Sequence, residues 1–406
     1  MKYDVILIGG GLVGASCALS LRHTNLSIAM VDARLQNQVD GRLFALHAGS
    51  SEFLKNIGVW SLLSSYASPI HQVHVSHQGC FGSVRLSREE MNMPALGQVI
   101  PAFYLEAALQ EGLMTLPNFT LYRPARLKEI KQNEVATVLI ETETGEKTLT
   151  ASLVVGADGT ESTVRQNTNI AVETKDYQQS ALVTKIALKR THHHVAYERF
   201  NDQGAIAMLP LQNNECACII TADTDTISEW MGCGETDFLK QLQKDFGYRL
   251  GRFSGVGKRL TYPLHFVRAE KAVQNRVLLL GNALHTLHPI AAQGLNLALY
   301  EVALFSEAVA EACENHIAIS VINLEKISER MEKQQAISLS LSHRLTQIFS
   351  RESRFLSVLL SMGMVALDQA KPIKNTLMAH LMGKAGCVPR LLLSEIDHEK
   401  TIPTNF

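Results

Sequence analysis

Short apolar runs alternate with amphipathic stretches at the start of the chain. Tyr3–Ile8 and Leu26–Val31 are apolar enough to be buried strands, and the apolar positions of Ala15–Arg22 recur at helical spacing. A strand, a helix and a second strand in this order predict the first unit of an α/β fold. A later run, Arg276–Leu280, predicts another buried strand, and a long amphipathic helix opens at Gly294.

The middle and the end of the chain have different patterns. Between residues 177 and 264 the apolar positions follow strand patterns, interrupted by one predicted helix at Glu235–Phe246. The predicted strands are Ala181–Leu188, Val195–Phe200, Ala205–Leu211 and Cys216–Thr221. From Leu295 the chain is mostly helical. We therefore expect an α/β domain, a second domain built on a sheet, and a helical C-terminal region.

Composition limits the kinds of partner. A chain of 406 residues is long enough for two domains, and a formal net charge of −1 provides no basic field for nucleic acid. The seven cysteines are scattered and do not suggest a disulfide framework. Cys216 and Cys218 share one face of a predicted strand, where core packing is favoured over metal binding.

Nothing in the sequence predicts secretion or a membrane span. The first apolar run is broken by three glycines and reads as a strand, not as a signal peptide. The longest uncharged stretch near the C-terminus, Phe355–Leu367, has 13 residues and is too short to cross a bilayer. We expect a cytoplasmic protein that touches the cytoplasmic face of a membrane at most.

The first informative motif follows the first predicted strand directly and runs from Gly9 to Gly14. In a nucleotide-binding unit, Gly9 allows the tight turn, Gly11 allows the close approach of a pyrophosphate, and Gly14 allows the helix to pack on the strand. Asp32 ends the second strand 18 residues after Gly14, where a carboxylate can accept hydrogen bonds from a ribose hydroxyl. This motif predicts a dinucleotide site.

Two further blocks carry polar residues just after predicted strands. Ser152–Val155 leads into Asp158 and Gly159, at the carboxyl end of a strand where open α/β sheets hold ligands; the alternative is a helix start capped by a hydroxyl group. In Leu280–Val302, a strand ends at Asn282 and a helix opens near Gly294. Free backbone N–H groups at such a junction favour an electron-rich ligand.

Arg42 and two groups of histidines allow competing interpretations. Arg42 precedes a predicted helix whose apolar face begins at Leu46, and we interpret it as a clamp for a cofactor phosphate or sugar instead of a surface arginine. The alternation in His71–His77 predicts a strand, whose three histidines we assign to one polar face and not to a metal site. His192–His194 is predicted to be an exposed turn.

Taken in chain order, the three blocks resemble the FAD-contacting motifs of the class A flavin-dependent aromatic hydroxylases. Within these, the chain is most similar to the ubiquinone-biosynthesis branch and its 2-polyprenyl-6-methoxyphenol hydroxylases. The segments that carry the similarity to this branch are His74–Arg85, Ala196–Phe200, Leu209–Leu211, Gly247–Gly251 and Leu287–Ile290.

The resemblance implies an α/β protein with a p-hydroxybenzoate-hydroxylase-like fold. This fold combines a Rossmann-type FAD-binding domain, an inserted mixed β-sheet substrate domain and a helical C-terminal region. The implied boundaries are 1–70, 98–175 and 265–330 for the FAD-binding domain, 71–97 and 176–264 for the substrate domain, and 331–406 for the helical region.

The resemblance also implies the chemistry. FAD, reduced by NAD(P)H, would use O2 to hydroxylate a prenylated phenol, so neither a side-chain acid or base nor a metal is expected. Pro289 and Gly294 would lie near the isoalloxazine, and Met208 and Pro210 of the Ala205–Leu211 strand would contact the substrate. Cofactor contacts are implied for Gly9, Gly11, Gly14, Asp32, Arg42, Leu127, Asp158, Asn282, Pro289, Gly294, Leu295 and Asn296.

Three positions depart from the pattern of the family. Asn282 stands where many relatives have aspartate, Ala292 where glycine is common, and Phe103 where many relatives have an arginine that touches the flavin. These departures leave open a non-catalytic flavoprotein that binds lipid phenols or scaffolds a biosynthetic complex. A flavin reductase acting on prenyl groups is a further alternative.

Apolar residues also recur at helical spacing near the C-terminus. A peripheral membrane contact, a surface for a ubiquinone-biosynthesis complex, and a face that covers the domain interface are all compatible with this pattern. The residues concerned are Leu356, Leu359, Leu360, Met364, Leu377, Met378, Leu381 and Met382.

Overall fold

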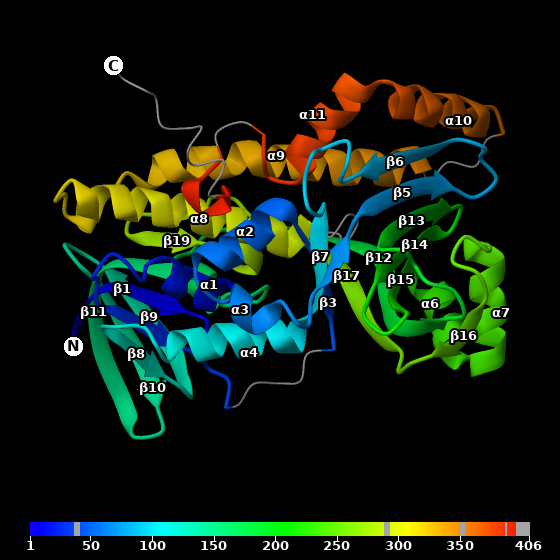
Figure 1. Ribbon diagram of the computed structural model, residues 1–406. Helices are drawn as coiled ribbons and strands as arrows, with labels where there is room; N and C mark the ends of the chain where they lie inside the picture. The colour runs from blue at the N-terminus through cyan, green and yellow to red at the C-terminus, as the bar shows by residue number, and fades with distance from the viewer. Residues whose placement is uncertain (36–40, 288–292, 350–353, 386–387, 395–406) are drawn as a thin grey trace, which may run out of the picture.

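The fold is described from a computed structural model of the chain. It covers residues 1–35, 41–287, 293–349, 354–385 and 388–394. Two large sheets form the two halves of the molecule, and the C-terminal helices lie over both (Figure 1).

The first sheet has eight strands and contains the N-terminal strand. Its main path is β18-β19-β11-β1-β2-β8, and β10 and β9 extend it as an antiparallel flap beside β11. The pairs β11–β1, β1–β2, β2–β8 and β11–β19 are parallel, as the βαβ pattern predicted. The strands are β1 Lys2–Ile8, β2 Ile28–Val31, β8 Phe119–Tyr122, β9 Ala125–Gln132, β10 Ala136–Thr142, β11 Gly145–Gly156, β18 Val273–Gln274 and β19 Val277–Leu279.

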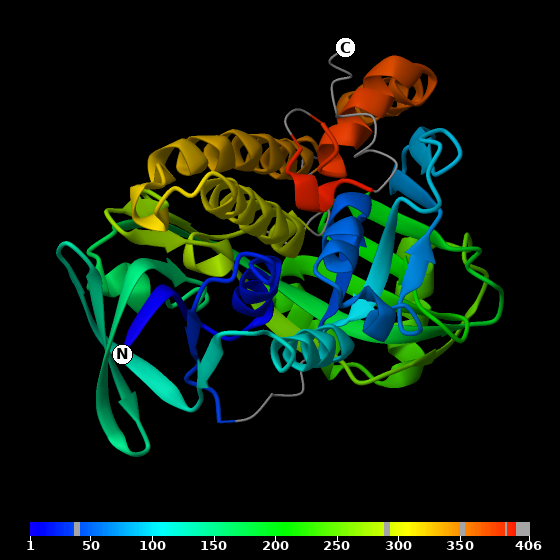
Figure 2. The same cartoon turned by 60° about the vertical axis from the view of Figure 1, so that its left-hand side comes forward.

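Helices pack on this sheet and complete the largest apolar core. The strand β1 is buried from Val5 to Ile8 because helices cover the sheet around it. Figure 2 shows α1 beside α8 and α4, the helices with which it makes contact. The helices of this half are α1 Leu12–Ser20, α2 Ala48–Asn56, α3 Trp60–Leu63, α4 Ala102–Leu113, α5 Thr163–Asn167 and α8 Gln293–Glu314.

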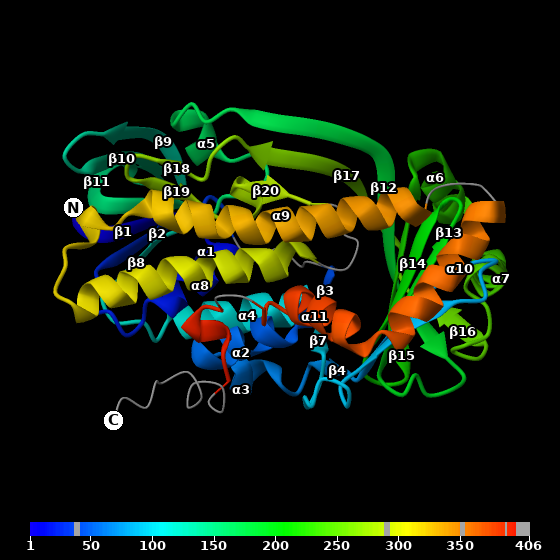
Figure 3. The same ribbon diagram turned by 90° about the horizontal axis from the view of Figure 1, so that it is seen from above.

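The second sheet has nine strands in the order β20-β17-β12-β15-β14-β13-β5-β6, with β16 paired to β12. Two long strands, β12 and β17, run side by side from the first half of the molecule into the second (Figure 3). The strands are β5 Gln72–His77, β6 Ser83–Ser87, β12 Val172–Leu188, β13 Val195–Asn201, β14 Gly204–Pro210, β15 Glu215–Asp223, β16 Phe253–Val256, β17 Leu260–Ala269 and β20 His285–Thr286.

The second sheet has an outer and an inner face. Helices α6 (Thr224–Gly232) and α7 (Glu235–Phe246) cover the outer face, where Cys216 and Cys218 are fully buried, which confirms their predicted place in the core. The inner face packs against a small sheet of β3 (Leu43–His47), β7 (Gly97–Pro101) and β4 (Ser68–Ile70). Strand alternation therefore decides which residues of the second sheet face the first half.

The C-terminal helices lie across both halves. They are α9 (Leu324–Phe349), α10 (Arg354–Gln369) and α11 (Lys371–Leu381), and α9 runs beside α8 before it reaches the second sheet (Figures 1 and 3). Met364 is buried against Phe200, and Met378 is buried in the apolar cluster of the inner face. At these positions the apolar pattern covers an internal interface. Within the described residues, no helix combines the length and apolar character needed to cross a bilayer.

The structure corrects three local predictions. Leu46 belongs to a strand, because β3 occupies Leu43–His47 and the helix begins only at Ala48. The histidines of β5 do not share a face, because His74 and His77 are an odd number of residues apart. His192 is buried instead of exposed, and its Nε2 donates to the carbonyl oxygen of Leu211 at 2.8 Å.

Candidate active site

The glycine loop after β1 has the geometry that its spacing predicts. Gly9 has φ +106°, and a Cβ atom there would overlap the carbonyl of Ala157. A Cβ atom at Gly14 would overlap the carbonyl oxygen of Gly9, so only glycine lets α1 pack this close to β1. A Cβ atom at Gly11, in contrast, would meet no atom within 4 Å among the described residues other than its chain neighbours. A Cβ atom at Gly10 would overlap the carboxylate of Asp32, so the loop has three crowded glycines, and only Gly11 faces open space.

Asp32 ends β2 in a nearly buried position next to this loop. Its Oδ2 lies 3.0 Å from Nη2 of Arg34 and 2.5 Å from Nη2 of Arg123. Burial alone would raise the pKa of Asp32, but the hydrogen bonds of Arg34 and the charges of Arg34 and Arg123 hold it below its ordinary value. Arg34 also donates to the carbonyl oxygen of Gly10 at 2.6 Å. Asp32 is therefore an ionised anchor of the glycine loop.

Asp158 follows β11 at the same edge of the sheet. Its Oδ2 accepts hydrogen bonds from the hydroxyl of Thr163 at 2.8 Å and from the backbone N–H of Val164 at 3.1 Å. Its Oδ1 is buried and has no hydrogen-bond partner in the described part of the chain. A buried carboxylate oxygen without a donor is costly unless a ligand supplies one. Ser162 caps the short helix that follows, so the capped helix start is also present.

Arg165 connects the Asp158 loop to the third block. Its Nη1 donates to the carbonyl oxygen of Ala283 at 2.9 Å and its Nη2 to that of Thr160 at 2.8 Å. The hydroxyls of Thr160 and Thr286 lie 3.0 Å apart. These contacts join two segments that are more than a hundred residues apart in sequence, and together the segments form one edge of the first sheet.

A fully buried carboxylate supports the turn of the third block. Oε2 of Glu301 accepts from the backbone N–H of Gly281 at 3.0 Å. Its Oε1 lies 2.5 Å from Nε2 of His285 and 2.9 Å from Nε2 of Gln335. The side chain of Glu301 thus ties α8, the turn, β20 and α9 together. Asn282, at the surface of this turn, is exposed.

The start of α8 lies next to the small sheet. Asn296 donates from Nδ2 to the carbonyl oxygen of Ala45 at 2.9 Å, and its Oδ1 accepts from the backbone N–H of His47 at 3.0 Å. Burial lowers the pKa of His47 to about 4. Apart from the neighbouring residues and the backbone of α8 itself, no atom of the described residues lies within 4 Å of a Cβ atom placed on Gly294, and Leu295 is half-buried. Pro289 and Ala292 lie outside the described residues.

The other predicted cofactor residues lie at the margins of this edge. Arg42 is exposed, and its guanidinium carbon lies 5.4 Å from the ring centre of Phe44. Leu127 is half-buried on β9 and packs against the core of the first sheet. Phe103 is 48% exposed on α4, where its ring contacts that of Tyr104 edge-on.

The predicted substrate strand β14 directs alternate side chains to the outer and the inner face of the second sheet. Met208 is fully buried in the outer cluster with Phe238 and Phe246, so its side chain cannot line the inner face as expected. Pro210 has the same parity and is buried as well. Ala207 and Leu209 point to the inner face and are half-buried. Residues of odd number on β14 therefore face the first half of the molecule.

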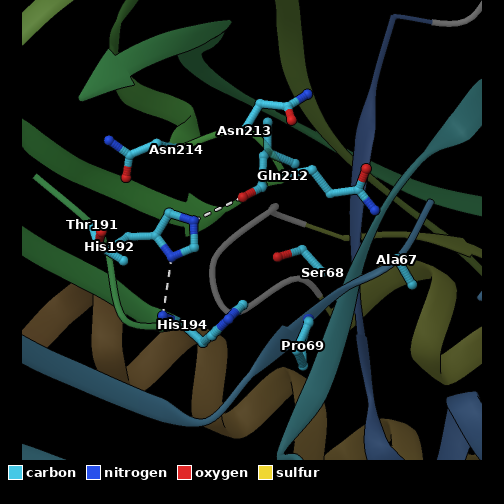
Figure 4. A pocket seen from close by; sticks show the side chains of 10 residues that line it. Ala67, Ser68, Pro69, Thr191, His192, His194, Gln212, Asn213 and Asn214 are labelled. Carbon is cyan, nitrogen blue, oxygen red and sulfur yellow. Dashed lines mark hydrogen bonds between the residues drawn. The ribbon is translucent and has the colours of Figure 1, made fainter. Parts of the chain in front are cut away.

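A cavity of about 440 Å³ lies at the edge of the second sheet, away from the three blocks. Figure 4 shows it between the turn that contains His192 and His194 and the turn that contains Asn213 and Asn214. The Nδ1 of His192 accepts from the backbone N–H of His194 at 3.0 Å, so its ring is held by the protein itself. Of the predicted site residues that the structure describes, none lines this cavity.

The described residues fit a flavin dinucleotide and contain no metal site. Gly11 and Gly294 face open space, Asp158 has an unused buried acceptor, and Asn282 is exposed at the same edge. In the part of the chain that the structure describes, no three His, Cys, Asp or Glu side chains form a group that could hold a metal ion.

The fold and this edge define a class of protein. Residues 2–318 match the family model described as an FAD binding domain, so the chain belongs to this family of FAD-binding monooxygenases. The structure of p-nitrophenol 4-monooxygenase PnpA from Pseudomonas putida DLL-E4 is similar, with a TM-score of 0.78 and 17% identity. The match covers 95% of this chain and 100% of that chain, which confirms the aromatic-hydroxylase fold.

Curated relatives narrow the class to the ubiquinone-biosynthesis branch. The chain is 30% identical over 400 residues to a protein named ubiquinone hydroxylase UbiL from Rhodospirillum rubrum, a match that covers 96% of this chain and 92% of the relative. It is 25% identical to 3-demethoxyubiquinol 3-hydroxylase from Escherichia coli, over 94% of this chain and 98% of the relative. The predicted resemblance to FAD hydroxylases of this branch is thereby confirmed.

Proposed function

We propose that this chain hydroxylates a prenylated phenol during ubiquinone biosynthesis, with FAD as cofactor, NAD(P)H as electron donor and O2 as oxidant. The names of the relatives support the pathway. The observation that carries the proposal is the convergence of the three blocks at one edge, where Asp158 holds a buried acceptor without a donor among the described residues. The overall reaction converts the phenol, O2, NAD(P)H and a proton into a hydroxylated phenol, NAD(P)⁺ and water.

In this proposal the residues of the chain bind and orient. The backbone at Gly11 faces the pyrophosphate, Asp158 accepts a hydrogen bond from the cofactor, and Asn282 offers its amide to the flavin side chain. The N–H groups at the start of α8, from Gly294 to Asn296, stabilise negative charge on the flavin ring. When bound, FAD supplies the hydride acceptance and the oxygen activation. Asp32 contributes by holding Arg34 and the glycine loop.

The substrate lies against the inner face of the second sheet in this proposal. Leu209 and Ile219 are half-buried there and pack against the same apolar cluster as Met91 and Met93. Flexible methionine side chains suit an irregular, prenylated ligand. We therefore propose that Ala207 and Leu209, and not Met208 and Pro210, are the substrate contacts on β14.

Asp158→Asn should weaken FAD binding about 10-fold, because the amide cannot offer acceptors on both sides as the carboxylate does. Titration of the apoprotein with FAD, followed by flavin fluorescence, measures the change. Asp202→Asn, at an exposed position, is the matched control and should bind FAD like the wild type. Equal affinity for all three proteins would contradict the role of Asp158.

Steady-state oxidation of NADH and NADPH tests the proposed reaction. The FAD-loaded protein is assayed in air with and without a 2-methoxyphenol that carries one prenyl unit. Consumption that rises with the phenol, requires O2 and yields a hydroxylated product supports the proposal. Flavin binding without any phenol-stimulated consumption would reject it and favour a non-catalytic role.

A further inference from the structure

One segment that carries the similarity to the ubiquinone branch, Ala196–Phe200, is divided by strand β13 between the two faces of the second sheet. Tyr197 and Arg199 point outward; Tyr197 lies against the ring of Phe246, and Arg199 donates to the carbonyl oxygen of Asp245 at 2.9 Å. Glu198 has the opposite parity and therefore faces inward. The sequence alone had suggested no role for a carboxylate on the inner face.

The surroundings of Glu198 are apolar. It pairs with Val75 on β5 and with Ala207 on β14, and Ala207 pairs in turn with Ile219 on β15. Its neighbours along the strand on the same face, Ala196 and Phe200, belong to two buried apolar clusters. Glu198 thus belongs to a row of half-buried residues across the sheet, and its two same-face neighbours along β13, Ala196 and Phe200, are buried.

The carboxylate has no partner within the described chain. No hydrogen bond or ion pair joins Glu198 to a described residue, and burial raises its pKa to about 7. Other titratable groups belong to the inner face or to elements packed on it, but none of them offsets the effect of burial on this pKa. They are His77 of β5, Lys185 of β12, His47 before α2, Asp368 of α10 and Lys374 of α11, the last paired with Asp368 and Glu90.

The row containing Glu198 lies near the cofactor edge. Asn296 at the start of α8 is bonded to Ala45 of β3, and Ala45 packs in the same apolar cluster as Leu209 and Ile219. Glu198 lies one strand beyond Ala207, at a spacing of about 4.8 Å between strands. On the far side of Ile219 the row continues through Val183 of β12 to Leu260 of β17. The Cδ1 atom of Leu260 lies 2.6 Å from the position of a Cβ atom placed on Gly41, next to Arg42.

We propose that Glu198 accepts the proton of the substrate's phenol hydroxyl and holds the ring as its phenolate. This inference rests on the proposed function and revises the expectation that no side-chain base takes part. The phenol O–H bond breaks, a bond forms between that proton and a carboxylate oxygen, and no electron is transferred. The phenolate ring is more electron-rich than the phenol, so it accepts electrophilic oxygen more readily. The proton returns to the oxygen when the hydroxylated product leaves.

Glu198→Gln tests this role with little change in shape. In the wild type, phenol-stimulated NAD(P)H oxidation should rise with pH through about 7, because only the ionised carboxylate accepts a proton. In Glu198→Gln that rise should disappear, and kcat should fall about 100-fold while KM changes little. Glu173→Gln, at an exposed position of β12 in the same sheet, should keep the wild-type rate and pH profile.

A second measurement does not depend on turnover. The ultraviolet difference spectrum of the prenylated 2-methoxyphenol bound to the oxidised protein distinguishes phenol from phenolate. Wild type at pH 8 should show the phenolate band and Glu198→Gln should not, whether or not NAD(P)H is consumed. Phenolate in both proteins, or an unchanged pH profile in the variant, would overturn the role of Glu198. If the phenolate forms but NAD(P)H consumption fails, only the proposed reaction is rejected.

Discussion

Glu301→Ala should lower the free energy of unfolding by about 3–5 kcal/mol, the usual effect of removing one partner from a buried charged network. The substitution leaves the N–H of Gly281, the ring of His285 and the amide of Gln335 without their shared acceptor in a region closed to water. Because the turn at Gly281 and Asn282 is part of the edge to which we propose that FAD binds, FAD affinity should fall as well. Urea unfolding and FAD titration measure the two effects.

Two further variants separate the network from a general effect of mutation on α8. Glu311→Ala removes an exposed carboxylate of the same helix and should change stability by about 0.5 kcal/mol or less. Glu301→Gln keeps the volume of the side chain and one hydrogen-bond acceptor, so its free energy of unfolding should be higher than that of Glu301→Ala. If Glu301→Ala were as stable as Glu311→Ala, the buried carboxylate would not be supporting the turn.

Gly14→Ala and Gly11→Ala should both weaken FAD binding, but only Gly14→Ala should destabilise the apoprotein. At Gly14 the new methyl group meets the carbonyl oxygen of Gly9, so α1 must move away from β1. Such overpacking costs about 1–3 kcal/mol, and FAD binding should weaken by at least 10-fold because the loop moves too. At Gly11 the methyl group meets no protein atom within 4 Å, so apoprotein stability should change by about 0.5 kcal/mol or less.

In Gly11→Ala, a change in FAD affinity therefore reports on the contact between this backbone and the cofactor, and not on the stability of the protein. If the pyrophosphate lies against this backbone, the methyl group of Gly11→Ala occupies its space and FAD binding weakens although the apoprotein is intact. Wild-type FAD affinity in Gly11→Ala would place the pyrophosphate elsewhere. Unfolding of the apoproteins in urea and flavin fluorescence titration give both quantities on the same samples.

Local patterns predicted the elements and the glycine loop well. The run of apolar residues in β1, the helical spacing of α7 and the spacing of Gly9 and Gly14 depend on neighbours within a few residues. Each of these features is encoded where it occurs. The elements of the second sheet were also predictable, because its strands alternate with period two.

Contacts between distant segments could not be predicted in the same way. Arg123 reaches Asp32 across 91 residues and Gln335 reaches Glu301 across 34, and no local pattern connects either pair. The face of β14 was misjudged for a different reason. Both faces of the second sheet are covered, one by α7 and the other by β3, so a buried apolar residue such as Met208 does not reveal which side it faces.

The strand order of the first sheet has a consequence for how the chain is synthesised. β11 pairs with β1 on one side and with β19 on the other, and six of the nine strands of the second sheet, β12 to β17, are encoded between β11 and β19. A ribosome therefore releases β5, β6 and β12 to β17 before it releases Val277–Leu279. The second sheet can assemble while the first sheet still has an open edge at β11, where chaperones and aggregation compete for the nascent chain.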